Sequence, residues 1–141
     1  MFGKLILFFF IYQSIVLHAQ QNYIDFFLKN YTPKEGDIIF QDLDSSPLCD
    51  AIEEVTPGIF HQNFSHVGMI IKDKKKYKII EAFSEGVKII SIKNFLERSV
   101  TKDGIPKITI AQIKSKVQKE KPNLIRRAIK KSKKFLGIPY D

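Results

Sequence analysis

Two short stretches decide the fold of this chain: Gly36-Asp37-Ile38-Ile39-Phe40 and Ser65-His66-Val67-Gly68-Met69-Ile70-Ile71. Each contains an apolar run rich in β-branched residues, which favours a buried strand. The second run leads through a charged turn, residues 72–76, into another apolar run over residues 77–83. This order predicts a β-hairpin. Gly68 lies inside the first arm of the hairpin, where a missing side chain allows another backbone to approach closely.

Outward from this hairpin, the sequence alternates between strand and helix signals. Further strands are predicted over residues 87–92 and 108–113, and helices over residues 21–31, 48–55, 93–99 and 122–136. The last helix is the most regular, since Pro122 suits a first helical turn and Gly137 and Pro139 supply stop signals. A few strands in a meander, with helices before and after, predict the α+β class.

Length and composition restrict the kinds of site that the chain can build. The 141 residues, 44% of them hydrophobic, suit one small domain with a core. The single Cys excludes an internal disulfide and a cysteine-based zinc cluster. His61 and His66 are the only histidines outside the N-terminal segment, and no carboxylate follows them at a familiar metal-ligand interval. We expect no metal and no cofactor.

The net charge of +8 is concentrated near the C-terminus. Residues 1–100 hold 11 Lys and Arg against 12 Asp and Glu, whereas residues 101–141 hold 12 against 3. A basic stripe of this kind is either a solvated helix face or a surface for an anionic partner. If the protein is exported, an anionic polymer of the cell envelope is a better partner for it than nucleic acid.

The N-terminus has the pattern of an export signal. Lys4 is followed by an uncharged apolar run over residues 5–17, and Ala19 supplies a small residue before a cut. The 13-residue run is too short to span a bilayer core of about 30 Å as a helix. We therefore predict a signal peptide over residues 1–19, a domain over residues 20–141, and a periplasmic or secreted protein. A retained N-terminal helix is the alternative.

His66 and Glu81 are the residues best placed for chemistry. His66 begins a predicted strand, where its imidazole can project from the strand end, and Glu81 lies on the returning strand. If paired positions add up to 147, His66 faces Glu81 and the carboxylate can fix the tautomer of the imidazole. If they add up to 148, Glu81 points to the other face of the sheet. The turn length leaves both registers open.

These motifs carry a resemblance. The GDIIF and SHVGMII stretches resemble the paired strands of the NlpC/P60 cysteine hydrolases, and their order resembles the circularly permuted branch, the YiiX/YebB-like (C92) papain-like amidases. In that branch a Gly-Asp-Ile strand is followed by a Ser-rich helical segment, Ser-His-Val-Gly, a Glu-Ala strand, a Gly-Val strand and a Phe-Leu helix. This chain shows each in that order, with Ser45-Ser46, His66, Glu81-Ala82, Gly86-Val87 and Phe95-Leu96.

The resemblance implies a papain-like antiparallel sheet with flanking helices and a cysteine hydrolase activity on amide or ester bonds. His66 would be the general base, Glu81 the orienting residue and Asp37 a structural residue. The family places its cysteine after a Gly-x-Pro-Tyr-Asp stretch, which here is residues 137–141. We therefore expect the domain to be C-terminally incomplete, with the nucleophile beyond Asp141, and this chain alone to be inactive.

Other nucleophiles and other functions remain as alternatives. Cys49 lies near the start of a predicted helix but not at the family's cysteine position, and Ser45 and Ser46 read as loop or N-cap residues. For a monomeric hydrolase we expect a peptide, amide or acyl-lipid substrate. A non-catalytic envelope-binding module and an acyltransferase of the same permuted fold are the rival functions.

Overall fold

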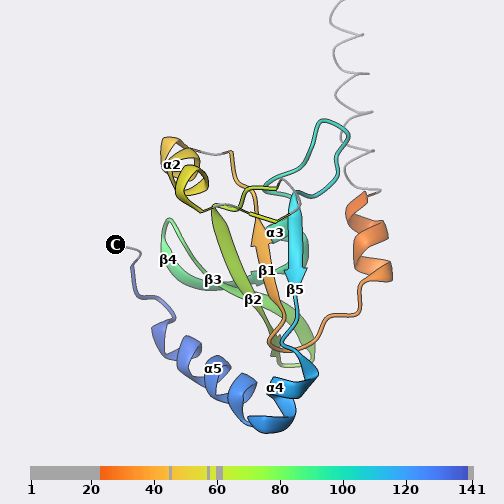
Figure 1. Ribbon diagram of the computed structural model, residues 1–141, viewed down its shortest axis with the longest axis vertical. Coiled ribbons are helices and arrows are strands. Elements are labelled where there is room, and N and C mark those ends of the chain that lie inside the picture. Colours follow the sequence, from red (N-terminus) through yellow and green to blue (C-terminus); the bar gives the residue numbers. More distant parts are fainter. Residues whose placement is uncertain (1–22, 45, 57, 60–61, 140–141) are drawn as a thin grey trace, which may run out of the picture.

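The computed structural model describes residues 23–139 except residues 45, 57, 60 and 61 (Figure 1). The predicted signal peptide, Ser45 and His61 lie outside the described residues. Five antiparallel strands form one sheet in the order β4-β3-β2-β1-β5. The strands are β1 (Ile38–Gln41), β2 (His66–Asp73), β3 (Lys76–Phe83), β4 (Gly86–Ser91) and β5 (Ile108–Ala111). This sheet, with helices packed against it, confirms the expected α+β class and its antiparallel arrangement.

Helices precede, interrupt and follow the sheet. Residues 23–30 are helical, and the later helices are α2 (Pro47–Val55), α3 (Ile92–Leu96), α4 (Ser115–Glu120) and α5 (Leu124–Ser132), which continues into the 3-10 turn η1 (Lys133–Phe135). The N-terminus of α2 is capped by Ser46, whose side chain accepts from the backbone N–H of Cys49. No helix in the described part of the chain is long and apolar enough to cross a membrane.

Several predicted boundaries differ from the structure; among them, α3 ends at Leu96 rather than residue 99, and β5 ends at Ala111 rather than residue 113. The strand expected over residues 87–92 ends at Ser91, because the Ser91 side chain accepts from the backbone N–H of Asn94 and caps α3. The helix expected over residues 122–136 begins at Leu124 and tightens into a 3-10 turn after Ser132. Helix α4 was not predicted. It has no buried residue, so the sequence lacks the periodic apolar positions that indicate a helix.

The register of the β2–β3 hairpin is neither of the two considered. Paired positions add up to 149, with Gly68 opposite Glu81 and Asp73 opposite Lys76. The pairing therefore continues to a two-residue turn, in which Lys74 adopts a positive φ of 57°. The observed register differs from the 147 register by two positions, so every side chain keeps the face that the 147 register gives it. His66 and Glu81 thus share a face, in diagonal rather than directly opposed positions.

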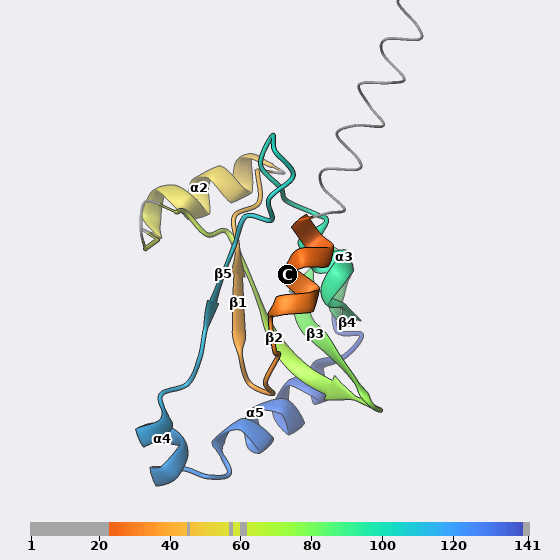
Figure 2. The ribbon, with the colours of Figure 1, turned by 90° about the vertical axis from the view of Figure 1, so that its right-hand side faces the viewer.

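One face of the sheet carries the core. Ile39, Ile70 and Ile79 pack there against α3 and the helical residues 23–30, which contribute Ile24, Ile92, Phe95 and Leu96 (Figure 2). Gly68 lies among these residues, and a Cβ placed on it would be 2.4 Å from Cγ2 of Ile79. The close neighbours at Gly68 are side chains, those of Ile79, Phe95 and Ile39, and not the other backbone that the sequence suggested. We call this side of the sheet the packed face.

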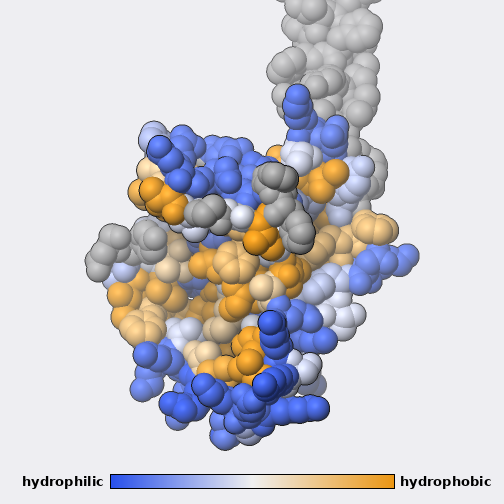
Figure 3. Space-filling view, in the orientation of Figure 1, coloured by the Kyte–Doolittle hydropathy of each residue, from blue (hydrophilic) through white to orange (hydrophobic). Residues whose placement is uncertain are grey.

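The other side, which we call the open face, is hollow. Helix α2 covers one end of it, and α5 with η1 covers the other (Figures 1 and 2). Between them lies a cavity of about 840 Å³. Figure 3 shows apolar residues gathered in this central hollow, with hydrophilic residues above and below it. The two faces of one sheet therefore differ sharply in how well they are filled.

Candidate active site

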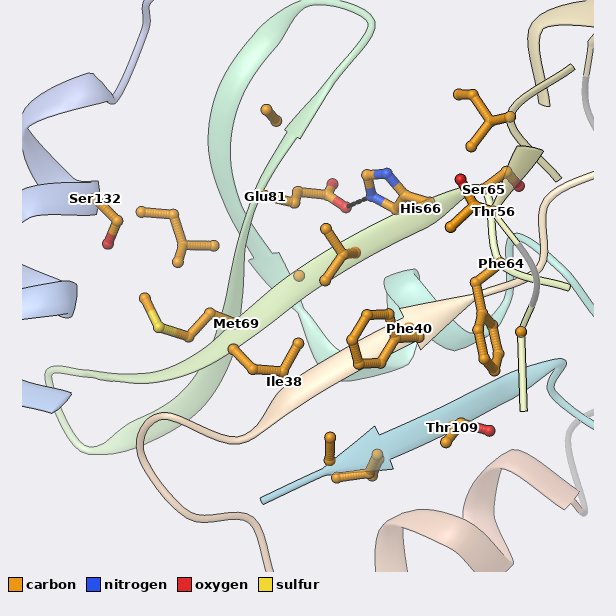
Figure 4. Close-up of a pocket in the computed structure, with 18 of the residues that line it drawn as sticks. Ile38, Phe40, Thr56, Phe64, Ser65, His66, Met69, Glu81, Thr109 and Ser132 are labelled. Carbon is orange, nitrogen blue, oxygen red and sulfur yellow. Dashed lines mark hydrogen bonds and ion pairs between the residues drawn. The ribbon is translucent and has the colours of Figure 1, made fainter. Parts of the chain in front are cut away.

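His66 and Glu81 form a hydrogen-bonded pair at one end of the sheet. Nε2 of His66 lies 2.8 Å from Oε2 of Glu81 (Figure 4). His66 is the first residue of β2, and 9% of its side-chain surface is exposed. The Glu81 side chain, on β3, is completely buried. The structure thus brings together the two site residues that the sequence singled out.

Two aromatic rings hold the imidazole in place. The ring of Phe95, from α3, stacks on it with centroids 5.6 Å apart, and the ring of Phe83 meets it edge-on at 5.2 Å. Because Nε2 is engaged by a carboxylate, a neutral His66 carries its proton on Nε2 and leaves Nδ1 as an acceptor. Among the described residues Nδ1 has no hydrogen-bond partner. This nitrogen is therefore the one that can accept a proton from another group.

Arg98 completes the site, and sequence reasoning missed it. Its guanidinium donates to both oxygens of Glu81, from Nη1 to Oε2 at 2.9 Å and from Nη2 to Oε1. Burial raises the pKa of Glu81, but hydrogen bonds from His66 and Arg98 and the charge of Arg98 outweigh burial and hold this pKa below its ordinary value. Glu81 is thus kept ionised beside the imidazole. The only available signal was general, since a buried carboxylate needs a cationic partner.

The cavity on the open face meets this site at its edge. Its walls are mostly apolar, and Figure 4 shows Ile38, Phe40, Met69 and Phe64 around it. His66 and Glu81 also line it, although the alternation of β2 and β3 turns their side chains toward the packed face. The remaining walls come from α2, β4, β5 and α5, and from the loop that precedes β2. An apolar hollow next to a histidine–carboxylate pair suits a substrate or a chain segment that shields the reaction from water.

A comparison with protein-family models identifies the family. The model described as "Permuted papain-like amidase enzyme, YaeF/YiiX, C92 family" matches residues 32–141. The chain belongs to this family. The match confirms the resemblance drawn from the sequence motifs and gives the protein a hydrolase class, amidase, at the level of the family. No match was found among curated proteins.

Cys49 is the one cysteine in residues 1–141 of this permuted papain-like amidase. It is buried in the first turn of α2, where the Ser46 hydroxyl donates to Sγ over 3.5 Å. It is not among the residues that line the cavity beside His66. Ser46 is an N-cap residue, as the sequence indicated. Ser46, like Cys49, does not line the cavity.

One carboxylate cluster of the amidase has metal-like geometry. Ligand oxygens of Asp42, Asp44 and Glu53 lie within 4.8 Å of one another. However, Nζ of Lys107 is 2.9 Å from Asp42 and 2.6 Å from Asp44, so a lysine supplies the cation there. Hydrogen bonds from Lys107 lower the pKa of Asp44, while burial raises that of Asp42.

Asp37 has the structural role that the family resemblance implied. Its carboxylate is buried just before β1 and accepts hydrogen bonds from the Tyr31 hydroxyl, the Lys34 backbone N–H and the Gln112 amide. These three bonds tie the segment before β1 to the segment after β5. Asp37 therefore anchors two segments that lie far apart in the sequence and takes no part in the site around His66.

Proposed function

We propose that the protein is a cysteine hydrolase for amide or ester bonds in which His66 is the general base and Glu81 orients it. One observation carries this proposal: the buried carboxylate of Glu81 engages Nε2 and leaves Nδ1 of His66 unpartnered among the described residues. A histidine whose distal nitrogen is held by a carboxylate is the arrangement that activates a nucleophile in hydrolases of this type. Family membership supports the hydrolase class.

The proposed reaction moves one proton through Nδ1. Nδ1 accepts the thiol proton, and the resulting thiolate adds to the substrate carbonyl carbon. The imidazolium, stabilised by Glu81, returns this proton to the leaving amine or alcohol as the carbon–heteroatom bond breaks, which leaves a thioester. Water then gives a proton to Nδ1 and its oxygen to the carbonyl carbon. The carboxylic acid departs, and the thiol recovers its proton.

Cys49 is not among the residues that line the cavity, which favours a thiol from a segment other than α2. We place it in the segment that Gly137 and Ile138 lead into. The backbone N–H of Gly137 donates to the carbonyl of Val87, and the carbonyl of Ile138 accepts from the N–H of Val87, both at 2.9 Å. Val87 lines the cavity beside Ala82 and Glu81. Residues 137–138 are thus held at the rim of the cavity that His66 also lines.

Alkylation and kinetics test this assignment in the full-length protein. Iodoacetamide followed by peptide mass spectrometry should label a cysteine other than Cys49 fastest. Thiol-dependent hydrolysis of amide and ester substrates should survive Cys49→Ala and be lost in His66→Ala. Loss of turnover in Cys49→Ala, or turnover that persists in a folded His66→Ala, would refute the roles assigned here. Product analysis with added amine or alcohol acceptors separates hydrolysis from acyl transfer.

We further propose that the protein works outside the cytoplasm, on peptides, amides or acyl lipids of the cell envelope. The support comes from the N-terminal pattern of Lys4, the apolar run over residues 5–17 and Ala19. N-terminal sequencing of the protein recovered from bacterial cells should begin at residue 20. A mature protein that retains Met1 in the cytoplasmic fraction would rule out this location.

A second candidate function is binding to an anionic envelope polymer. Residues 112–139 contain ten Lys and Arg against Glu120 alone, and all ten basic residues are exposed on α4, α5 and the turns around them. Charge reversal by Arg126→Glu with Arg127→Glu should weaken salt-sensitive binding to a polyanion such as teichoic acid. The matched control is Lys29→Glu with Lys102→Glu, which makes the same change in net charge at exposed positions elsewhere. Equal weakening in both variants would indicate a non-specific charge effect.

A further inference from the structure

Glu81 is fully buried, yet both of its oxygens are engaged by Arg98. The Arg98 guanidinium lies over the rings of Phe83 and Phe95, with Cζ at 4.4 Å and 5.3 Å from their centroids. The same two rings hold the imidazole of His66. His66, Glu81 and Arg98 therefore form one continuous unit that two aromatic side chains keep in register.

We propose that Arg98 is a positioning residue that sets the tautomer of His66 through Glu81. For catalysis this proposal rests on the function proposed above for His66, but the assigned effect is a property of the folded protein. Arg98 itself touches neither the reacting nitrogen nor a substrate. It acts by determining what the carboxylate can do at Nε2.

Hydrogen-bond chemistry gives the reason. An arginine only donates, so two N–H groups aimed at Glu81 require two accepting oxygens, which an ionised carboxylate provides. An ionised Glu81 must accept from Nε2–H, and the proton of a neutral ring is then fixed on Nε2. A protonated Glu81 can instead donate to Nε2, which moves the ring proton to Nδ1 and removes the acceptor that the proposed reaction needs. Arg98 selects the first state.

The other charged groups near Glu81 do not replace Arg98. Lys88 is the cross-strand neighbour of Glu81 on β4, but its Nζ lies over the ring of Phe83 and 3.5 Å from Glu85. On the β2 side Glu81 pairs with Gly68, which brings no charge, and α3 presents the apolar Phe95. Without Arg98 the buried carboxylate would keep, among the described residues, hydrogen-bond support from His66 alone.

The test compares Arg98→Met, which keeps an unbranched side chain over Phe83 and Phe95 but lacks the charge, with Arg98→Lys, which keeps the charge and loses the two-pronged geometry. Carboxyl carbon NMR follows the titration of Glu81, and ring nitrogen shifts report the tautomer of His66. In Arg98→Met the Glu81 titration midpoint should rise by roughly 1–3 pH units. The Nδ1–H tautomer should appear, and Arg98→Lys should restore part of the original behaviour.

An unchanged Glu81 midpoint and an unchanged tautomer in a folded Arg98→Met would overturn the proposal. If Arg98→Met does not fold, Arg98→Gln and Arg98→Lys carry the same comparison. None of these readouts needs turnover, so the proposed hydrolase function can fail while the tautomer result stands. If turnover is present, Arg98→Met should lower kcat more than it changes KM, with part of the rate restored in Arg98→Lys.

Discussion

The two faces of the sheet differ in packing: one is closely filled and the other borders a cavity. On the packed face, helix α3 and residues 23–30 fill the space so closely that a Cβ on Gly68 would be 2.4 Å from Ile79. On the open face the side chains surround a cavity of about 840 Å³. The rigid side chains His66, Glu81 and Arg98 lie against the packed face, and the available volume lies on the other. The positions of these three side chains are thus fixed by packing on the packed face, whereas the space for a substrate lies on the open face.

Helix α3 both covers the packed face and positions the imidazole of His66. Phe95 is completely buried in the core and stacks on His66, and its backbone carbonyl accepts from the amide of the buried Gln41. Close packing allows one low-energy position for such groups, whereas a hollow region allows several. The His66–Glu81 pair is therefore held by the packed face, the part of the protein that tolerates substitution least.

The largest difference between the faces should come from removing an aromatic ring from each. Phe95→Ala should lower the free energy of unfolding by about 3–5 kcal/mol, because it leaves a void in a close-packed cluster. Phe40→Ala should cost less than about 2 kcal/mol, because its ring is partly exposed toward the cavity. Urea unfolding of both variants measures the difference. Equal losses would show that the open face is as well packed as the other.

A smaller difference should come from adding atoms to each face. Gly68→Ala places a methyl group 2.4 Å from Ile79 and 3.2 Å from Phe95, so we expect a loss of about 1–3 kcal/mol. Ala111→Val adds two methyl groups at an exposed position that lines the cavity, where we expect a change within about 0.5 kcal/mol. Thermal and urea unfolding of the pair test this expectation. A marked loss in Ala111→Val would mean that the cavity is not free space.

Sequence periodicity was enough to find the five strands and α2, since apolar runs and turn residues mark them. It could not set the hairpin register, because Lys74 takes a positive φ where glycine or asparagine would have marked the turn. The faces of His66 and Glu81 depended on this register. The role of Arg98 could not be predicted from the sequence for another reason. Arg98 lies 17 positions after Glu81, and the contact exists only because α3 turns the chain back across the sheet end.

The smallest expected effect distinguishes a fully buried carboxylate, Glu81, from a partly exposed one, Asp73. The pKa of Glu81 is held below its ordinary value of 4.5, so the unfolded chain takes up a proton before the folded protein does as the pH falls. The stability that Glu81 contributes is complete above about pH 4.5 and is lost as the pH falls through its folded pKa. Hydrogen bonding to Lys78 also lowers the pKa of Asp73, but that side chain is half-buried at 28% exposure, so salt screens it more than it screens Glu81.

The unfolding free energy of the wild-type protein should therefore fall on acidification below about pH 4.5, and Glu81→Gln should flatten this slope more than Asp73→Asn does. The difference should persist at high salt, because screening acts more on the partly exposed Asp73–Lys78 pair than on the buried Glu81. Urea titrations between about pH 3 and 6 at two salt concentrations measure both slopes. If Asp73→Asn flattened the slope as much as Glu81→Gln, the buried carboxylate would not be the group that links acid sensitivity to the packed face.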